Sequence, residues 1–293
     1  MTVAAAAALL AGSTGAVLGS LPDVRPLRRT APGTTAFMRA AGEQATEPWV
    51  PLATVSPYLA CAVVKAEDRR FFVHRGIHWR QLGKAVGRTA RGARMGGSTI
   101  TQQLARNLYL GPERTVRRKA REALVARRLE RSLGKPRILE LYLNVIEWGD
   151  GVWGAEGAAR GWFGKPAAEL DAFESVFLSG LVAAPRAPLA GANAQRAAGV
   201  QLRVADQLYR SGILTPDEWR GLRGRLADMH AALRAGTPAP VALRTPPGPP
   251  RPRVLPLPRR DAAAHLPAAR AVADGCGLRN ELQSERLSQE NGR

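Results

Sequence analysis

Two short blocks restrict the fold and chemistry of this chain more than any other feature. The first, KAEDRRFFVHRG, covers Lys65 to Gly76 and sets an acidic pair among basic and aromatic residues. The second, GGSTITQQLARN, covers Gly96 to Asn107 and gathers hydroxyl and amide side chains at an expected helix start. Such side chains are poor core material but suit an anionic or sugar ligand. The blocks therefore predict a binding site for such a ligand.

Apolar residues recur at helical spacing around these blocks. Ser56 and Pro57 are typical of a helix start, and the apolar positions after them put Glu67 near that helix's end. Further helices are expected at 77–91, from 98, at 115–133, from 136, at 155–162 and at 170–182, with two more between 195 and 234. No alternating run long enough for a strand is present. The sequence therefore predicts a mainly α-helical protein.

Two further blocks carry charged residues at helical spacing. RRKAREA, residues 117–123, puts Glu122 on one helix face with Arg118 and Lys119. From the spacing alone, these residues are interpreted as an intrahelical salt-bridge cluster. KPRILELYLNVIEWGDGVWG, residues 135–154, sets Glu140 and Asn144 one turn apart, which leaves packing between helices and substrate contact both open.

In order and spacing, the four blocks resemble the motif series of the family 51 glycosyltransferases, the peptidoglycan polymerases that join lipid II into glycan strands. The resemblance runs from about Cys61 to Leu189. Arg106 stands where the family usually has lysine. The matching residues are Glu67, Asp68, Phe71, His74 and Gly76; Gly96, Ser98, Thr99, Ile100, Thr101, Gln102, Gln103 and Asn107; Arg118, Lys119 and Glu122; and Ile138, Leu139, Glu140, Tyr142, Leu143 and Asn144.

The resemblance implies a lysozyme-like helical glycosyltransferase domain with a mobile small lobe. It implies two catalytic carboxylates. Glu67 would be the general base for the acceptor sugar's 4-hydroxyl, and Glu122 would hold Mg²⁺ or Mn²⁺, or polarise the bases that meet the donor pyrophosphate. No organic cofactor is expected. The residues expected to bind substrate are Asp68, His74, Ser98, Thr99, Gln102, Gln103, Arg106, Asn107, Arg118 and Lys119.

The charge of the chain keeps other functions open. The net charge is +19, and residues 65–144 hold 20 Lys and Arg against 6 Asp and Glu. An excess of this size attracts anionic partners, so a nucleic-acid-binding helical protein is one alternative. A lysozyme-like lytic glycosidase is another, although it has no use for the Lys119 and Arg118 pair. The resemblance favours an inverting polymerase. The sequence has no S-x-x-K, S-x-N and K-T-G motifs in the arrangement of a penicillin-binding domain, so no transpeptidase activity is predicted.

The ends of the chain are expected to lie outside the catalytic domain. Residues 1–21 carry no charge and could just span a bilayer, with a cleaved signal or a disordered start as alternatives. The arginines that follow would favour a cytoplasmic domain, whereas the family's domain faces outward from the inner membrane into the periplasm. The expected organisation is an anchor at 1–21, a linker at 22–57, the glycosyltransferase domain at 58–190, helices at 191–236 and a Pro-rich disordered tail at 237–293.

The expected partners are lipid II, the growing glycan strand, membrane lipids and cell-wall synthesis proteins, but no nucleic acid. Cys61 lies in an apolar helical run, where an unpaired cysteine acts as a small buried hydrophobe. Cys276 lies in the tail. No disulfide is predicted between the two.

Overall fold

The protein divides into two compact, mainly helical units. The computed structural model describes residues 21–45, 47–77, 97–113 and 115–239, together with 243, 272, 276 and 277. Residues 1–44 and 75–134 form the first unit, and residues 45–74 and 135–293 form the second. The helix expected at 77–91 lies almost wholly outside the described residues, as does most of the Pro-rich tail.

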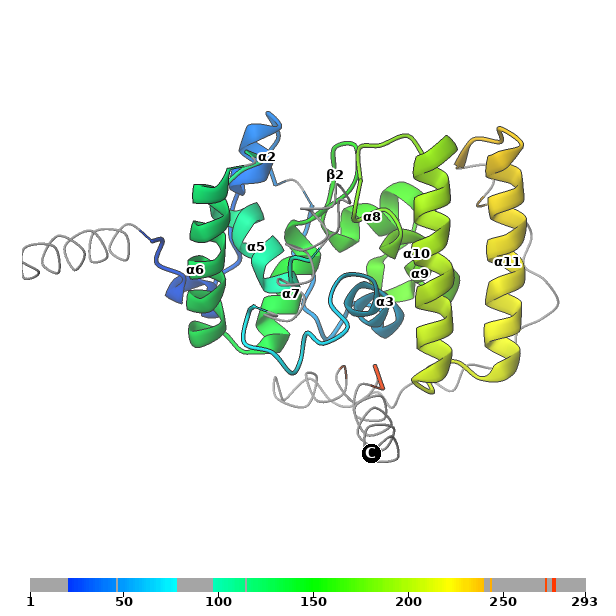
Figure 1. The fold of residues 1–293 in the computed structure, drawn as a ribbon, viewed down its shortest axis with the longest axis horizontal. Helices are drawn as coiled ribbons and strands as arrows, with labels where there is room; N and C mark the ends of the chain where they lie inside the picture. Colours follow the sequence, from blue (N-terminus) through cyan, green and yellow to red (C-terminus); the bar gives the residue numbers. More distant parts are fainter. Residues whose placement is uncertain are drawn as a thin grey trace, which may run out of the picture. The chain divides into compact units, whose positions relative to one another are not determined.

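The first unit is built around helix α5. It contains the 3-10 helix η1 (Arg25–Arg28) and the helices α2 (Ala36–Ala40), α5 (Ile100–Tyr109) and α6 (Val116–Ser132). Helix α5 packs against both α2 and α6 (Figure 1). Its apolar stripe of Ile100, Leu104 and Leu108 is buried, as the spacing predicts.

Part of the expected linker belongs to this unit's core. Val24, Leu27 and Met38 are buried, and the Arg28 guanidinium donates a hydrogen bond to the carbonyl of Ser132 at 2.7 Å. Thr30, Pro32 and Thr34 lie in the short connection between η1 and α2. Residues 22–44 are therefore folded rather than extended.

The second unit is a layered helical body. Its elements are α3 (Pro57–Glu67), α7 (Lys135–Val145), β1 (Glu147–Gly149), β2 (Val152–Trp153), α8 (Gly154–Phe163), the 3-10 helix η2 (Ala167–Glu169), α9 (Ala172–Ser179), α10 (Gly191–Arg210) and α11 (Pro216–Arg234). Helix α3 packs against α9 and α10, and α11 packs against α10 (Figure 1). The antiparallel pair β1 and β2 was not expected, because such short strands leave no alternating pattern.

The predicted start of α3 is right in position but not in its contact. Ser56 is the N-cap residue, yet its hydroxyl makes no capping bond. It donates instead to the carbonyl of Leu170 at 2.7 Å and is buried there. Ser56 therefore fastens the start of α3 to the segment before α9.

The two cysteines form a disulfide, contrary to the prediction. Cys61 on α3 is bonded to Cys276, 215 residues later in the chain, with their Cα atoms 5.3 Å apart. Both residues are buried. The prediction was wrong because sequence spacing carries no signal for a bridge over so long a separation. At least this point of the expected tail is held on the folded domain.

The described residues contain no helix long and apolar enough to cross a membrane. The predicted anchor occupies residues 1–21, and residues 1–20 lie outside the described part of the chain.

A buried histidine joins α11 to its neighbours. His230 Nε2 lies 2.6 Å from Oε1 of Gln201 on α10, and the Gln201 amide donates to the carbonyl of Phe177 on α9. Burial, with a smaller contribution from Arg234, lowers the pKa of His230 below its ordinary 6.5. The folded protein therefore favours the neutral imidazole.

This depressed pKa predicts acid destabilisation. As the pH falls below 6.5, His230 becomes protonated in the unfolded chain but stays neutral in the folded protein. The free energy of unfolding therefore decreases with falling pH until the pH is below the pKa of His230 in the folded protein. Urea unfolding between pH 7.5 and 5 should show this slope, and His230→Gln should reduce it. An equal slope in both proteins would contradict the role given to His230.

Candidate functional site

The first block places two adjacent carboxylates in different environments. Glu67 is the last residue of α3 and is partly exposed, whereas Asp68, the C-cap residue, is 2% exposed. Asp68 Oδ2 lies 2.7 Å from Nε2 of His74. This contact joins the two ends of the loop that follows α3. Of the two acids, Glu67 is the one that is partly exposed.

Aromatic packing completes the loop. Phe71 is fully buried and makes edge contacts with the rings of Phe72 and His74. The ammonium of Lys135 lies 4.4 Å from the centre of the Phe71 ring, within cation–π range. The aromatic and histidine positions of the first block thus fix the backbone directly after Glu67.

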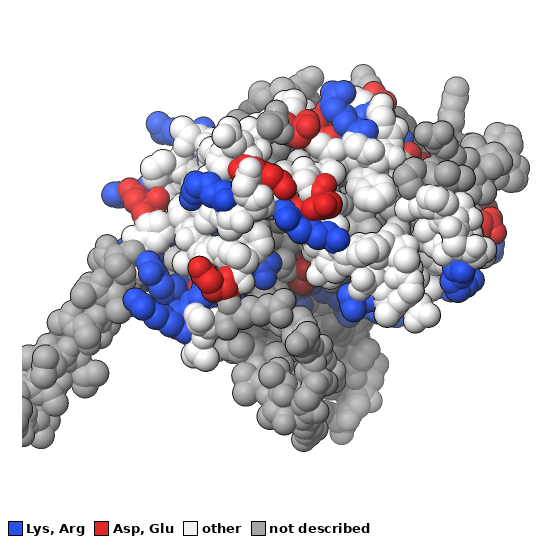
Figure 2. Space-filling model, turned by 90° about the horizontal axis from the view of Figure 1, so that it is seen from above, with Lys and Arg blue, Asp and Glu red and all other residues white. Residues whose placement is uncertain are grey.

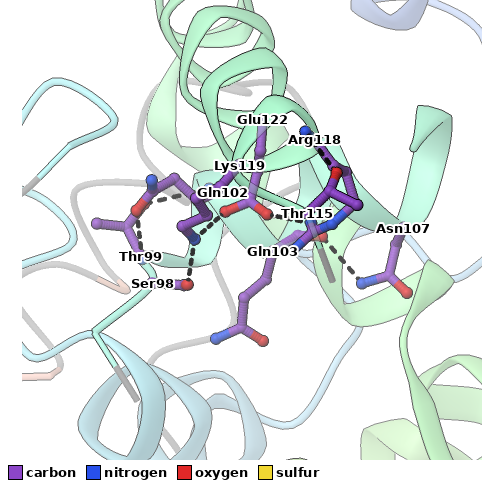
Figure 3. A network of polar contacts seen from close by, with 9 residues as sticks. All are labelled: Ser98, Thr99, Gln102, Gln103, Asn107, Thr115, Arg118, Lys119 and Glu122. Carbon is purple, nitrogen blue, oxygen red and sulfur yellow. Dashed lines mark hydrogen bonds and ion pairs between the residues drawn. The ribbon is translucent and has the colours of Figure 1, made fainter. Parts of the chain in front are cut away.

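The third block forms a buried ion cluster in the first unit. The Glu122 side chain is 2% exposed, and each of its carboxylate oxygens contacts a different cation. Oε2 lies 2.7 Å from Arg118 Nη1, and Oε1 contacts Lys119 Nζ. Lys119 also donates to the Ser98 hydroxyl at 2.7 Å (Figure 3). The cluster has one more positive than negative charge, and the Lys119 side chain remains 37% exposed.

The surroundings of Glu122 do not fit a divalent cation. Both oxygens are already engaged by cationic side chains, and the carboxylate is almost wholly enclosed. Calcium and magnesium sites gather several oxygen ligands. The described residues contain no group of three or more His, Cys, Asp or Glu side chains placed to hold a metal ion. The residues around Glu122 therefore do not fit the Mg²⁺ or Mn²⁺ ion that the resemblance implied.

The second block contains a helix cap. Thr99 Oγ1 accepts from the Gln102 backbone N–H, and Gln102 Oε1 accepts from the Thr99 N–H, each at 3.1 Å. The Thr99 hydroxyl also donates to the Gly76 carbonyl at 2.6 Å. This capping box accounts for Thr99 and Gln102 without a ligand. The T-x-x-Q spacing was a signal for it, which sequence reasoning missed.

Three further polar residues of the second block, Gln103, Arg106 and Asn107, lie on α5. Asn107 is buried and its amide donates to the Gln103 carbonyl at 2.9 Å. The Gln103 side chain is partly exposed and extends away from Glu122 (Figure 3). The Arg106 guanidinium lies 5.2 Å from the centre of the Phe37 ring on α2. Of the predicted site residues in this block, Gln103, Arg106 and Ser98 are partly exposed, whereas Thr99, Gln102 and Asn107 are buried.

The fourth block serves packing. Glu140 accepts from Trp49 Nε1 at 3.2 Å and from the Leu52 N–H at 2.9 Å. The Asn144 amide donates to the Val50 carbonyl and accepts from the Val50 N–H. Both side chains thus hold the segment that enters α3. Of the two interpretations left open by the sequence, these contacts favour packing.

Gly76 ends the first block where the chain meets α6. Its φ is +85°, and an added Cβ would lie 2.9 Å from Glu130 Cγ and 3.3 Å from the Ala126 carbonyl oxygen. A side chain there is expected to cost about 1–2 kcal/mol for the backbone conformation, with the close contact adding to this.

Gly42→Ala is a matched control, because Gly42 has φ +75° with nothing within 4 Å of an added Cβ. Urea denaturation should therefore show a larger loss of stability for Gly76→Ala than for Gly42→Ala. Equal losses would show that α6 does not exclude a side chain at position 76.

Comparisons with known proteins identify the family. The sequence model of a family described as Transglycosylase matches residues 34–209. The chain belongs to this family. The match spans all four blocks, so the resemblance inferred from the motifs is confirmed.

Relatives with the name "Biosynthetic peptidoglycan transglycosylase" occur in several bacteria. The protein of Laribacter hongkongensis is 45% identical over 166 residues, which cover 53% of this chain and 73% of that protein. That of Alcanivorax borkumensis is 42% identical over 183 residues, covering 61% and 75%. That of Rhodospirillum centenum is 47% identical over 139 residues, covering 47% and 60%.

Proposed function

We propose that this transglycosylase is an inverting peptidoglycan glycosyltransferase that polymerises lipid II into β-1,4 glycan strands and has no transpeptidase activity. The observation that carries the proposal is the family match over residues 34–209, together with relatives named for peptidoglycan transglycosylation. In the reaction, the acceptor 4-hydroxyl attacks the donor's anomeric carbon. A new glycosidic bond forms as the bond to the lipid pyrophosphate breaks, which inverts that carbon.

Glu67 is the proposed general base. It takes the proton of the attacking hydroxyl, for which a carboxylate within hydrogen-bond reach is needed. The support is the contrast between the two acids at the end of α3. Asp68 is buried against His74, whereas Glu67 is partly exposed at the tip of a packed helix.

Lys119 and Arg118 are the proposed ligands of the departing pyrophosphate. Cationic side chains that are already in position stabilise the negative charge that develops on the pyrophosphate as it leaves. Glu122 and Ser98 hold the Lys119 ammonium at a partly exposed position, so Glu122 acts by orienting these bases. Gln103 and Arg106, which retain exposed surface on α5, are proposed to bind substrate alongside them.

We further propose that the catalytic part acts on the outer side of the cytoplasmic membrane, with residues 1–21 as anchor. The Cys61–Cys276 disulfide supports an outer location, because disulfides persist in oxidising compartments such as the periplasm. The nucleic-acid alternative receives less support, because the family match and the named relatives are transglycosylases. On the face in view in Figure 2, Lys and Arg side chains are interspersed with Asp and Glu.

The direction of the chemistry tests the proposal. The full chain is supplied with labelled lipid II together with unlabelled, preformed glycan strands. We expect label to enter material of high molecular weight while the preformed strands keep their length. Shortening of the strands without incorporation of label would instead identify a lytic glycosidase.

A further inference from the structure

One face of α3 carries two residues that the proposed chemistry does not use. Cys61 and Lys65 stand one helical turn apart, and each is 2% exposed. Glu67 follows Lys65 by two residues, about 3 Å along the helix axis. Whatever holds this face therefore acts close to the proposed base.

The first contact of this face is covalent. Cys61 is bonded to Cys276, and the next residue, Gly277, lies against the chain between α10 and α11. Gly277 has φ +64°, and an added Cβ would lie 2.3 Å from the Ser211 carbonyl oxygen. This approach is too close for any other residue. The turn at Cys276 and Gly277 is thus seated on both α3 and Ser211.

The second contact is a buried ammonium. Lys65 Nζ donates to the Ser211 hydroxyl at 2.7 Å, and both residues are buried. Ser211 is the C-cap residue of α10, and Lys65 stands in the last turn of α3. The carboxyl ends of helices attract positive charge, which favours a lysine at this point. A buried charge is costly to leave without its partners, so the geometry is expected to be specific.

We propose that Cys61, Lys65, Ser211, Cys276 and Gly277 form a redox-dependent brace that positions the end of α3, and with it Glu67. The inference rests on the proposed function of Glu67. A phosphine reductant supplies two electrons and is oxidised to the phosphine oxide, while water supplies the oxide's oxygen and two protons. The disulfide thereby becomes two thiols, which releases the turn at 276–277. Lys65 and Cys61 are then positioning residues, since neither touches the reacting atoms.

A small displacement of Glu67 is expected to cause a large loss in the rate of glycan formation. Misplacement of a catalytic group by about 1 Å can cost on the order of 100-fold in rate. Freeing one side of α3 is expected to lower kcat at least about tenfold, with KM changed less than about twofold, because the residues proposed to bind the pyrophosphate are unaltered.

The test compares the oxidised full chain with the chain reduced by a phosphine reductant and with Cys276→Ser. Lipid II polymerisation gives kcat and KM, circular dichroism checks folding, and hydrogen exchange reports on peptides from α3. We expect reduced wild type and Cys276→Ser to share a lowered kcat and faster exchange at the end of α3. Reductant should not change Cys276→Ser further.

A variant that keeps both cysteines covers the case in which reduction unfolds the protein. Gly277→Ala should lower kcat, whereas Gly236→Ala should not, because Gly236 has φ +86° with nothing within 4 Å of an added Cβ. Equal kcat in the oxidised, reduced and Gly277→Ala proteins would overturn the brace while leaving the polymerase intact. An inactive oxidised wild type would instead defeat the proposed function on which the brace rests.

Discussion

Glu67→Gln is expected to lower the rate of glycan formation by about 100- to 10,000-fold, the usual contribution of a general base. Glutamine keeps the size and the hydrogen-bonding oxygen of the side chain but cannot take the proton of the acceptor hydroxyl. Because Glu67 is only partly buried, the fold should be unaffected. The loss should therefore fall on kcat, measured as the initial rate of polymerisation at saturating lipid II.

Glu169→Gln is the matched control for this prediction. Glu169 is an exposed acid of the same unit and should keep wild-type activity when neutralised. Thermal unfolding of both variants should match that of wild type. If Glu67→Gln kept more than about a tenth of the activity, another group would have to serve as the base.

Glu122→Ala is expected to cost about 3 kcal/mol of folding free energy. Removing one member of a buried ion pair typically costs about 3–5 kcal/mol, because the remaining charge loses its partner. The lower end applies here, since Lys119 is 37% exposed and can regain water. Activity should fall as well, because Lys119 loses the carboxylate that holds it beside Ser98. Urea unfolding and polymerisation assays measure the two effects separately.

Glu113→Ala provides the comparison for this second prediction. Glu113 is exposed on the loop before α6, so its removal should change stability by less than about 0.5 kcal/mol. A similarly small cost for Glu122→Ala would mean that the ion cluster contributes nothing to folding. The cluster would then be explained only by ligand binding.

Local patterns predicted much of this architecture. The i, i+3 and i, i+4 spacing anticipated the contacts of Glu122 with Lys119 and Arg118, which form within one helix. The buried stripe of α5 and the start of α3 after Ser56 likewise follow from neighbours in sequence. These features depend on residues less than two turns apart, which periodicity and capping rules describe.

Contacts between distant residues could not be predicted in this way. Lys119 reaches Ser98 across 21 residues, and Cys61 reaches Cys276 across 215. Such pairs depend on how helices pack, for which a single sequence holds no local signal. The expected linker shows the same limit, because its buried Val24 and Met38 carry no periodicity that distinguishes them from exposed residues.

The most direct test of the central claim is the product formed from lipid II by the folded, oxidised wild-type chain. Labelled lipid II is incubated with the protein in detergent, and the products are separated by size and by lipid content. The account predicts glycan strands of increasing length, with one lipid pyrophosphate released for each new glycosidic bond. Unchanged lipid II, with circular dichroism showing a folded helical protein, would contradict it.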